Sequence, residues 1–316
     1  MPARSRIGPA SVALGVLAAL ACALTALALS AIGGEVPYLG AVLAFGRPIV
    51  LALAVCGCGV AVAALVRGPR RLVPAILAVL LLACGGTSIA ASSGVTPALS
   101  TGDALRVLEW NTGGDADAAI AAVRASEPDI AVFPELYAGN LAPRSASLSG
   151  YTVLGGGDAA VAVLVSERFG DYVVTATGPA PAYAGIIVEP RDAMSDSPRI
   201  VGVHLTRTLW PSLAHLWADG LDWVSESCDD ANTIAIGDFN GGEPTVRRLG
   251  TCGTGGTWAQ IAQPATWPAD APAFLGAAID RVVPAEGWVL ESVETVTAPW
   301  GQGSDHRPVI AVLRPA

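Results

Sequence analysis

Five apolar runs in the C-terminal two thirds of this 316-residue chain each have, at one end, a side chain that can bind a cation or move a proton. Carboxylate and amide oxygens are ligands for hard divalent cations, and carboxylates and imidazoles can act as general acids or bases. Loops that converge at one sheet edge are a common way to build a site. The side chains are Asn111 after LRVLEW, Glu135 after IAVFP, His204 after RIVGV, Asp238 and Asn240 in GDFN, and Asp305 with His306 in GSDHRP.

Each of these residues also has an ordinary structural interpretation when it is taken alone. Asn111 after a strand is typical of a turn, and the GDFN run is typical of an Asx turn. Glu135 is compatible with a surface charge, and His204 with a buried core histidine whose ring nitrogens are satisfied. The ordered combination is more specific than any single member, and it indicates a hydrolytic site.

The segments that must position these side chains are many short strands and few long helices. That pattern favours an α+β sandwich over a doubly wound parallel sheet. The predicted helices are 115–126 and 211–226, the second of which begins at Pro211 and has an apolar face. The predicted strands are Leu105–Trp110, Asp129–Phe133, 151–155, 159–165, 172–177, 183–189, 199–203, 232–236, 279–283 and 308–313.

In this order the motifs resemble those of the endonuclease/exonuclease/phosphatase superfamily, the metal-dependent phosphoesterases similar to DNase I, exodeoxyribonuclease III and neutral sphingomyelinases. The resemblance covers residues 105–314 and implies a four-layer α/β/β/α sandwich for residues 105–316. The matching motifs are WN at 110–111, PEL at 134–136, VHL at 203–205, GDFN at 237–240, TWP at 266–268, ID at 279–280 and SDHRP at 304–308.

The resemblance implies a divalent cation, Mg²⁺ or in its place Mn²⁺, that stabilises charge on the phosphoryl oxygens and the leaving group. Glu135 is the leading metal ligand by this comparison, and Asn111 and Asp305 assist it directly or through water. Arg207 and Arg307 stand beside motif residues and are candidates to contact the substrate phosphate.

The resemblance also assigns the catalytic side chains. Asp238 would orient or deprotonate the attacking water, and Asn240 would position that water and a phosphate oxygen. His204 and His306 would contact the phosphate, and Asp280 would hold His306 by a hydrogen bond that raises the pKa of the imidazole. A second carboxylate that pairs with the first histidine in DNase I has two weak candidates in this sequence, Glu189 and Asp192.

The first 91 residues have a different character. Three uncharged apolar runs, at about 10–32, 48–66 and 72–91, each have the length of a transmembrane helix. Five flanking arginines on one side against one on the other predict that the N-terminus lies inside and everything after residue 91 outside. The first run also resembles a signal peptide, and its cleavage would leave the same placement of the C-terminal domain. The arginines are Arg4, Arg6, Arg67, Arg70 and Arg71 against Arg47.

Residues 92–104 form a short Ser/Gly/Pro linker that tethers the extracytoplasmic domain close to the membrane. Three spans before such a domain resemble the membrane-anchored proteins associated with vancomycin and teicoplanin resistance. Two cysteines after the linker, Cys228 and Cys252, predict a disulfide in an oxidising compartment. The chain has no lysine, and residues after 91 contain 26 of its 27 acidic residues and 12 of its 18 arginines.

These observations predict a multi-pass cell-membrane protein with an outward-facing, Mg²⁺-dependent phosphoesterase domain. Its expected partners are the lipid bilayer and a lipid-linked or small phosphate or pyrophosphate substrate. An extracytoplasmic nuclease is the first alternative, disfavoured by the scarcity of basic residues that release counterions from nucleic acid. A catalytically idle, membrane-tethered binding module is the second, disfavoured because no motif residue is missing.

Overall fold

The computed structural model describes residues 104–192, 194–207, 211–246, 248–253, 263–273, 276–297 and 303–316. The predicted membrane spans and the linker up to residue 103 lie outside these residues. Within the described ranges, every helix is too short or too polar to cross a bilayer.

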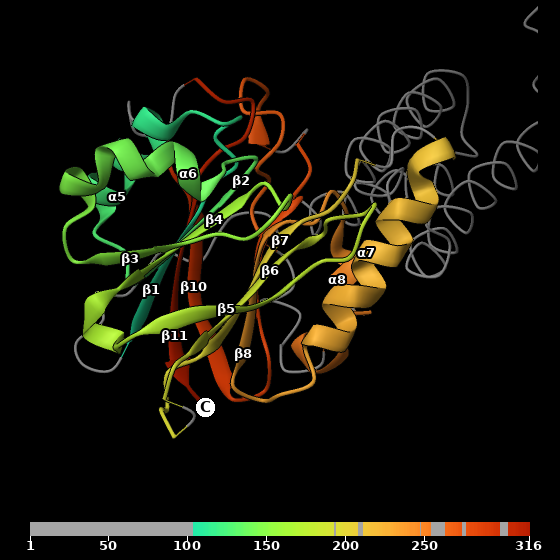
Figure 1. Ribbon diagram of the computed structural model, residues 1–316. Helices are drawn as coiled ribbons and strands as arrows, with labels where there is room; N and C mark the ends of the chain where they lie inside the picture. Colours follow the sequence, from blue (N-terminus) through green and yellow to red (C-terminus); the bar gives the residue numbers. More distant parts are fainter. Residues whose placement is uncertain are drawn as a thin grey trace, which may run out of the picture.

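Two β-sheets pack face to face and form the centre of the described domain (Figure 1). The six-stranded sheet has the order β10 (Trp288–Thr295), β11 (Val309–Pro315), β1 (Leu105–Glu109), β2 (Ile130–Pro134), β4 (Val161–Ser166) and β3 (Tyr151–Leu154). The five-stranded sheet has the order β5 (Tyr172–Thr177), β6 (Gly185–Pro190), β7 (Arg199–His204), β8 (Thr233–Asp238) and β9 (Asp280–Pro284). The pairs β1–β2 and β7–β8 are parallel, and the other neighbouring strands are antiparallel.

The main core lies between the sheets, and the alternation of each strand determines which residues enter it. In β1, Leu105 and Val107 pack toward the opposite sheet, whereas Leu108 packs on the outer face. The same alternation in β7 turns Ile200 inward and Val201 outward. Both faces of each sheet are therefore apolar, and each sheet requires a cover.

One long helix covers each outer face. Helix α5 (Ala116–Ser126) is capped by the carboxylate of Asp115 and packs Ile120 and Val123 on the six-stranded sheet. Helix α7 (Ala214–Ser227) packs Trp217 and Leu221 on the five-stranded sheet. The four-layer order predicted from the sequence is thereby confirmed. The shorter helices are α6 (Ala138–Leu141), α8 (Glu243–Val246), η1 (Ala142–Leu148), η2 (Glu167–Phe169), η3 (Pro211–Leu213) and η4 (Gly250–Gly253).

The ends of the predicted strands agree with the observed ones to within two residues, but one strand was missed. Strand β10 pairs with β11 through a bulge between Leu290 and Ser292. Its first half alternates buried Trp288 and Leu290 with more exposed neighbours. This period-two pattern was the available signal, and the glutamates interspersed in the strand obscured it.

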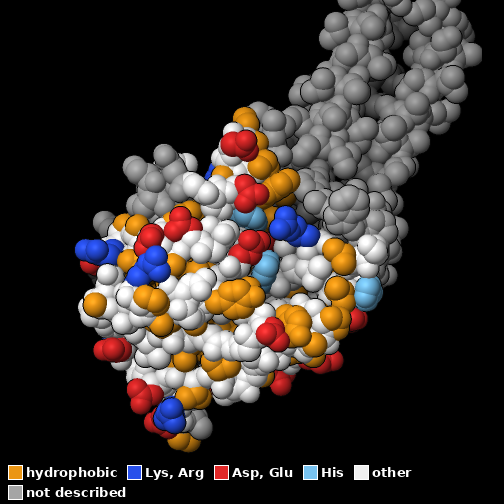
Figure 2. Space-filling view, turned by 45° about the horizontal axis from the view of Figure 1, so that its top comes forward, with side chains coloured by type: hydrophobic (Ala, Val, Ile, Leu, Met, Phe, Trp, Pro, Cys, Tyr) orange, Lys and Arg blue, Asp and Glu red, His pale blue; other side chains and the backbone are white. Residues whose placement is uncertain are grey.

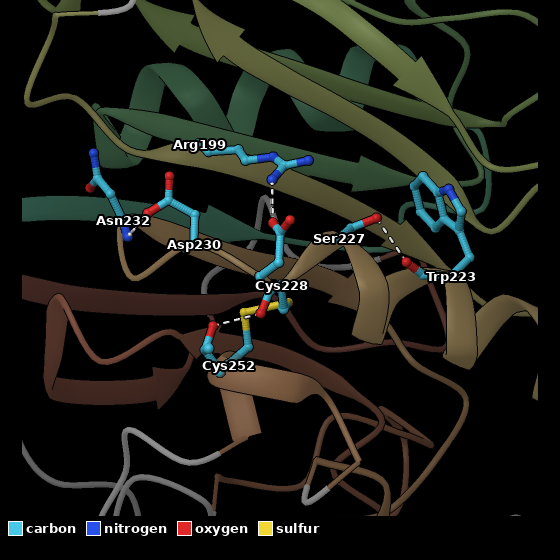
Figure 3. The surroundings of a disulfide bond; sticks show 9 residues. Arg199, Trp223, Ser227, Cys228, Asp230, Asn232 and Cys252 are labelled. Atoms are coloured by element: carbon cyan, nitrogen blue, oxygen red, sulfur yellow. Dashed lines mark hydrogen bonds and ion pairs between the residues drawn. A yellow bond between two sulfur atoms is a disulfide. The ribbon is translucent and has the colours of Figure 1, made fainter.

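The predicted disulfide joins the end of α7 to η4 (Figure 3). The Cα atoms of Cys228 and Cys252 lie 5.6 Å apart, within the usual range for a disulfide. The hydroxyl and backbone N–H of Thr251 both donate to the carbonyl of Cys228, at 2.6 and 3.0 Å. The bond thus fixes the segment after GDFN against the helix that covers the five-stranded sheet.

Candidate active site

The polar residues that follow the strands gather at one end of the sandwich. Parallel strands end at the same sheet edge, so Asn111 after β1 and Glu135 after β2 lie together, as do His204 and Asp238 at the ends of β7 and β8. Strands β9 and β11 are antiparallel to these neighbours and begin at that edge, which brings in Asp280 and His306. Figure 2 looks onto this end, where histidine, acidic and arginine side chains lie close together.

The GDFN segment requires its glycine. Gly237 has a φ of 143°, and a Cβ at this position would lie 2.0 Å from the carbonyl oxygen of Val203. The next turn is closed by the backbone N–H of Asn240, which donates to Asp238 Oδ1 at 2.8 Å. The indole of Trp217 donates to the carbonyl of Phe239 at 2.9 Å and attaches the turn to α7. Asp238 therefore enters the site from a constrained backbone.

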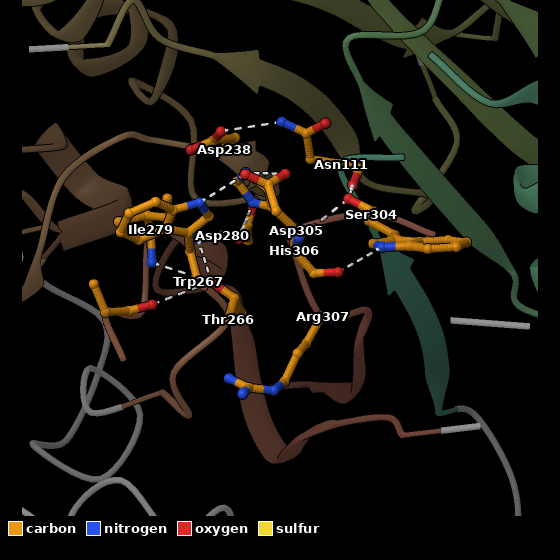
Figure 4. A network of polar contacts seen from close by, with 12 residues as sticks. Asn111, Asp238, Thr266, Trp267, Ile279, Asp280, Ser304, Asp305, His306 and Arg307 are labelled. Atoms are coloured by element: carbon orange, nitrogen blue, oxygen red, sulfur yellow. Dashed lines mark hydrogen bonds and ion pairs between the residues drawn. The ribbon is translucent and has the colours of Figure 1, made fainter. Parts of the chain in front are cut away.

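Asp238, Asp280 and His306 form the buried half of the site (Figure 4). One ligand atom from each of the three lies within 4.8 Å of the others. The Nδ1 atom of His306 is 2.8 and 3.0 Å from the two oxygens of Asp280. All three side chains are nearly inaccessible to solvent, so their charges interact in a poorly polarisable environment.

This environment shifts two pKa values. Burial alone would lower the pKa of His306, but the negative charge of Asp280 and its hydrogen bond outweigh burial and raise the pKa to about 10. Burial and the charge of Asp280 raise the pKa of Asp238 to about 7. In the protein without metal, His306 is thus a cation at neutral pH, and Asp238 titrates in the range useful for a general base.

A chain of hydrogen bonds holds the SDH segment, residues 304–306, in place. The hydroxyl of Ser304 donates to the carbonyl of Asn111 at 2.6 Å and accepts the backbone N–H of His306 at 3.1 Å. The indole of Trp110 donates to the carbonyl of His306 at 3.0 Å. The indole of Trp267 donates to Asp305 Oδ2 at 2.9 Å. The two tryptophans therefore anchor adjacent residues of this segment.

Glu135, His204 and Arg207 form the open half of the site. Glu135 Oε1 lies 3.7 Å from His204 Nε2 and 4.0 Å from a guanidinium nitrogen of Arg207. Burial lowers the pKa of His204, and the charge of Glu135 opposes this effect only in part. The imidazole of His204 is therefore neutral near pH 7 and can donate or accept a hydrogen bond.

Asn111 links the two halves. Its side-chain N–H₂ group donates to Glu135 Oε1 at 3.2 Å and to Asp238 Oδ2 at 3.3 Å. Its amide oxygen accepts the backbone N–H of Gly113 at 3.0 Å. The amide thus presents its donor face, not its oxygen, to the carboxylates of Glu135 and Asp238.

The sequence profile of the Endonuclease/Exonuclease/phosphatase family matches residues 108–306, which contain the motifs from β1 to the SDH segment. The chain belongs to this family. Members of the endonuclease/exonuclease/phosphatase family are hydrolases that act on phosphate ester bonds. The finer resemblance to the resistance-associated, membrane-anchored branch stays a prediction.

Solved structures share the fold of this family member. D. rerio TDP2 humanized by 14 mutations, and D. rerio TDP2 in complex with a single-strand DNA product, each have 16% identity and a TM-score of 0.50. Each alignment covers 67% of this chain and 100% of the other. The endonuclease/exonuclease/phosphatase from Bacteroides vulgatus has 15% identity and a TM-score of 0.49, with 69% and 100% covered. No curated protein sequence matches the chain.

The donor set of the site fits the divalent cation that the family generally uses. Glu135, Asp238 and Asp280 bring three carboxylates to one end of the sandwich. Among the described residues, they face His306, which is 2.8 Å from Asp280, and Arg207, whose guanidinium is 4.0 Å from Glu135. A fourth carboxylate, Glu109, is completely buried, and neither of its oxygens has a hydrogen-bond partner. A hard cation with oxygen ligands would compensate this excess of negative charge.

Glu109 is a residue of the site that the sequence interpretation missed. Burial raises its pKa well above that of a free glutamate, and the charges of Asp280 and Asp238 add to the increase. In the pattern LRVLE, alternation places Glu109 on the same face as Leu105 and Val107, which enter the core. That alternation was the signal that could have found it.

Of the predicted metal ligands, Glu135 has the clearest access to a cation. Asn111 presents its donor face to the cluster, as described above. Asp305 lies at the rim with a side chain that is 72% exposed, and its Oδ1 is 3.9 Å from His306 Nε2. Three of the predicted catalytic residues lie together, namely Asp238, Asp280 and His306. The side-chain amide of Asn240 donates to Asp238 Oδ2 at 3.2 Å and to the carbonyl of Leu205 at 2.8 Å.

Arg307 does not join the group, contrary to the prediction of a phosphate contact. Its guanidinium points away from the carboxylates in Figure 4 and donates to the carbonyls of Ala265 at 3.1 Å, Ala269 at 2.9 Å, and Ala271. Arg307 thus supports the segment around Trp267. Of the predicted phosphate-binding arginines, Arg207 is the one beside the site.

The two candidates for a carboxylate partner of His204 also lie elsewhere. Glu189 pairs with Arg199 at 3.0 Å, at the opposite end of the sheet from His204. Asp192 accepts the backbone N–H of Met194 at 3.0 Å within its own loop. The carboxylate that faces the imidazole of His204 is Glu135 instead.

Proposed function

We propose that the domain is a divalent-metal-dependent phosphoesterase of the cell envelope, held at the outer face of the membrane by its N-terminal segment. The observation that carries the enzymatic part is the grouping of Asp238, Asp280 and His306 opposite Glu135, with Asn111 between them. This arrangement provides a base, a cationic imidazole and a cation ligand around one space.

In the proposed mechanism, Asp238 accepts a proton from the attacking water at one of its carboxylate oxygens. A pKa of about 7 suits this role because the group is sufficiently deprotonated near neutral pH and still basic enough to take the proton. Asn240, whose amide touches the carboxylate of Asp238 at 3.2 Å, positions the water beside it. Glu135 would hold the divalent cation, which would stabilise charge on the phosphoryl oxygens.

Both histidines contact the phosphate in this mechanism. His306 remains protonated through its pairing with Asp280 and offers Nε2–H to a phosphoryl oxygen. The neutral His204 donates from the open half, and Arg207 supplies a further positive charge there. These donors stabilise charge that develops in the transition state.

The substrate we favour is a phosphate or pyrophosphate linked to a lipid or another envelope component. The apolar runs at 10–32, 48–66 and 72–91 support a membrane anchor, and the linker of about 13 residues would keep the site within tens of ångströms of the bilayer. An enzyme tethered in this way meets membrane-borne substrates at a high effective concentration. The acidic domain, with few arginines, disfavours long polyanions.

A hydrolysis panel on the full chain in membrane mimics would test the function. Polyprenyl pyrophosphate, phospholipid vesicles, duplex DNA and phenyl phosphate are compared with and without Mg²⁺, and Asp238→Asn serves as the inactive control. We expect Mg²⁺-dependent release of phosphate or of a phosphorylated head group from a lipid-linked substrate. Efficient cleavage of DNA with the lipid substrates untouched would establish the nuclease alternative instead.

A topology experiment would test the membrane placement separately. An alkaline phosphatase reporter fused after residue 316 folds and is active only outside the cytoplasm. We expect an active fusion, because the arginine distribution predicts an outward domain. If alkaline phosphatase is inactive at this position and a reporter that works only in the cytoplasm is active there, the predicted orientation is wrong.

A further inference from the structure

A pocket of about 290 Å³ opens directly beside the open half of the site. Its volume lies just below the range of about 300–1,000 Å³ that is usual for small-molecule sites, so it suits one compact group. The proposed mechanism uses only the wall where Glu135, His204 and Arg207 lie. The lining of the pocket includes Glu135, Asp158, Tyr183, His204 and Arg207.

Backbone strain concentrates at this pocket and the adjoining site. Four non-glycine residues in the described ranges have positive φ. One of them, Glu127, is the left-handed residue that ends α5, which is an ordinary use of this conformation. The other three are Glu135, Tyr183 and Asn240, with φ of 61°, 42° and 44°. Such residues are strained, and they cluster where function requires a fixed side chain.

Tyr183 is firmly connected to the site. Its backbone N–H donates to the carbonyl of Pro179 at 2.9 Å, which closes the turn before β6. The carbonyl of the next residue, Ala184, accepts the backbone N–H of His204 at 2.9 Å. The backbone of Tyr183, a residue that is 38% exposed, is therefore fixed at the pocket wall next to His204.

The charges of the lining residues select the kind of group that fits. With Glu135 engaged by the divalent cation, the remaining charges of the lining are Asp158 and Arg207. Asp158 is exposed and disfavours a second phosphate in the pocket, whereas the guanidinium of Arg207, 69% exposed, disfavours a cationic amine. The group that fits these charges is therefore neutral and offers both hydrogen-bond donors and hydrogen-bond acceptors. A carboxylate, an arginine and a tyrosine ring together provide acceptors, donors and a flat apolar surface for a hydroxylated ring.

We propose that this pocket binds the group attached to the reacting phosphate, and that this group is a sugar or another polyol. The proposal rests on the phosphoesterase function proposed above. Asp158 accepts hydrogen bonds from hydroxyl groups, the ring of Tyr183 packs against the carbon face, and Arg207 contacts the bridging region near the phosphate. The same chemistry is present in a polyol lipid headgroup and in a free sugar phosphate.

The test measures substrate preference in the full chain with Mg²⁺. The substrates are phosphatidylinositol vesicles, phosphatidylcholine vesicles, glucose 1-phosphate and phenyl phosphate, which differ in the lipid and in the hydroxyl groups. We expect kcat/KM to be higher for the two polyol substrates than for the other two. Phosphatidylinositol and glucose 1-phosphate together distinguish the lipid-linked source from the free one.

The decisive variants are Asp158→Asn and Tyr183→Ala. We expect the ratio of kcat/KM for polyol substrates over phenyl phosphate to fall about 10–100-fold in Asp158→Asn, because hydrogen bonds to a charged group are lost. Asp171→Asn, an exposed aspartate before β5 at the opposite end of the sheet, is the matched control and should keep the ratio. An unchanged ratio in both pocket variants, with melting temperatures like wild type, would overturn the proposal.

A binding measurement separates this proposal from the proposed function. Glucose 1-phosphate is titrated into the Asp238→Asn protein by calorimetry, with Asp158→Asn added in a second variant. One result would be that glucose 1-phosphate binds the Asp238→Asn protein, that the added Asp158→Asn change weakens this binding, and that the wild-type protein hydrolyses none of the substrates. This result would support the pocket and overturn the phosphoesterase function. Hydrolysis of phenyl phosphate without a preference for polyols would overturn the pocket and leave the function standing.

Discussion

The two halves of the site achieve their electrostatics in opposite ways. In the buried half, Asp238, Asp280 and His306 are excluded from water. Burial and the charge of Asp280 raise the pKa of Asp238, and the charge of Asp280 raises the pKa of His306 against the effect of burial. In the open half, Glu135 and Arg207 are partly solvated, and their contacts are as long as 4.0 Å. Short contacts that are buried from solvent fix the protonation states of the side chains before a ligand binds. Long contacts that are open to solvent leave space for a ligand. The chemistry is therefore expected to depend on the buried half, and recognition on the open half.

The largest effect expected from this comparison is on turnover. Changing Asp238→Asn keeps the shape of the buried half but removes the base, so kcat should fall about 10²–10⁴-fold. Steady-state kinetics with Mg²⁺ on the best substrate measure the loss, and circular dichroism checks the fold. Turnover near that of wild type would show that Asp238 is not the base.

The next effect separates metal binding from proton transfer. Glu135→Gln in the open half should raise the Mg²⁺ concentration required for half-maximal activity by about 10–100-fold, because a charged oxygen ligand becomes neutral. Glu167→Gln, at an exposed position away from the site, is the control. A larger Mg²⁺ requirement in Asp238→Asn than in Glu135→Gln would reverse the assignment of the two halves.

A third prediction concerns the stability of the buried half without metal. The folded pKa of His306, about 10, lies above its unfolded value near 6.5, so the stabilisation is complete below pH 6.5 and is lost as the pH rises toward 10. The free energy of unfolding in chelator should fall by roughly 3–5 kcal/mol across this window. Urea titrations followed by tryptophan fluorescence would measure it. His306→Gln should lack this component, and an equal slope in the variant would contradict the assignment.

The smallest expected effect concerns Glu109 beneath the buried half. Its raised folded pKa means that stability is lost as the pH rises above about 4.5, the range in which a free glutamate ionises. Glu109→Gln removes this loss, so the metal-free variant should be more stable than wild type by roughly 1 kcal/mol at pH 8 and about equal at pH 5. Thermal unfolding at both pH values tests it, and a variant less stable at pH 8 would show that the carboxylate has a stabilising partner.

The sequence determined the elements and the identity of most site residues. Alternating apolar residues are a local property, so the strands that end at Asn111, Glu135, His204 and Asp238 could be recognised without knowledge of their neighbours. The positions of these polar side chains at strand ends, and the order of the motifs, indicated the family. The arginine and cysteine patterns indicated an anchor, which stays a prediction, and a disulfide, which the structure contains.

Only the tertiary structure decided which of these residues act together. The amide of Asn111 meets Asp238 across 127 positions of sequence, and His306 meets Asp280 across 26, through the register of separate strands. The same long-range packing turned Arg307 away from the site and buried Glu109 without a partner. Periodicity arises from neighbouring residues and can be read locally. Burial, charge coupling and pocket shape arise from segments distant in sequence, so they exist only once the two sheets have packed.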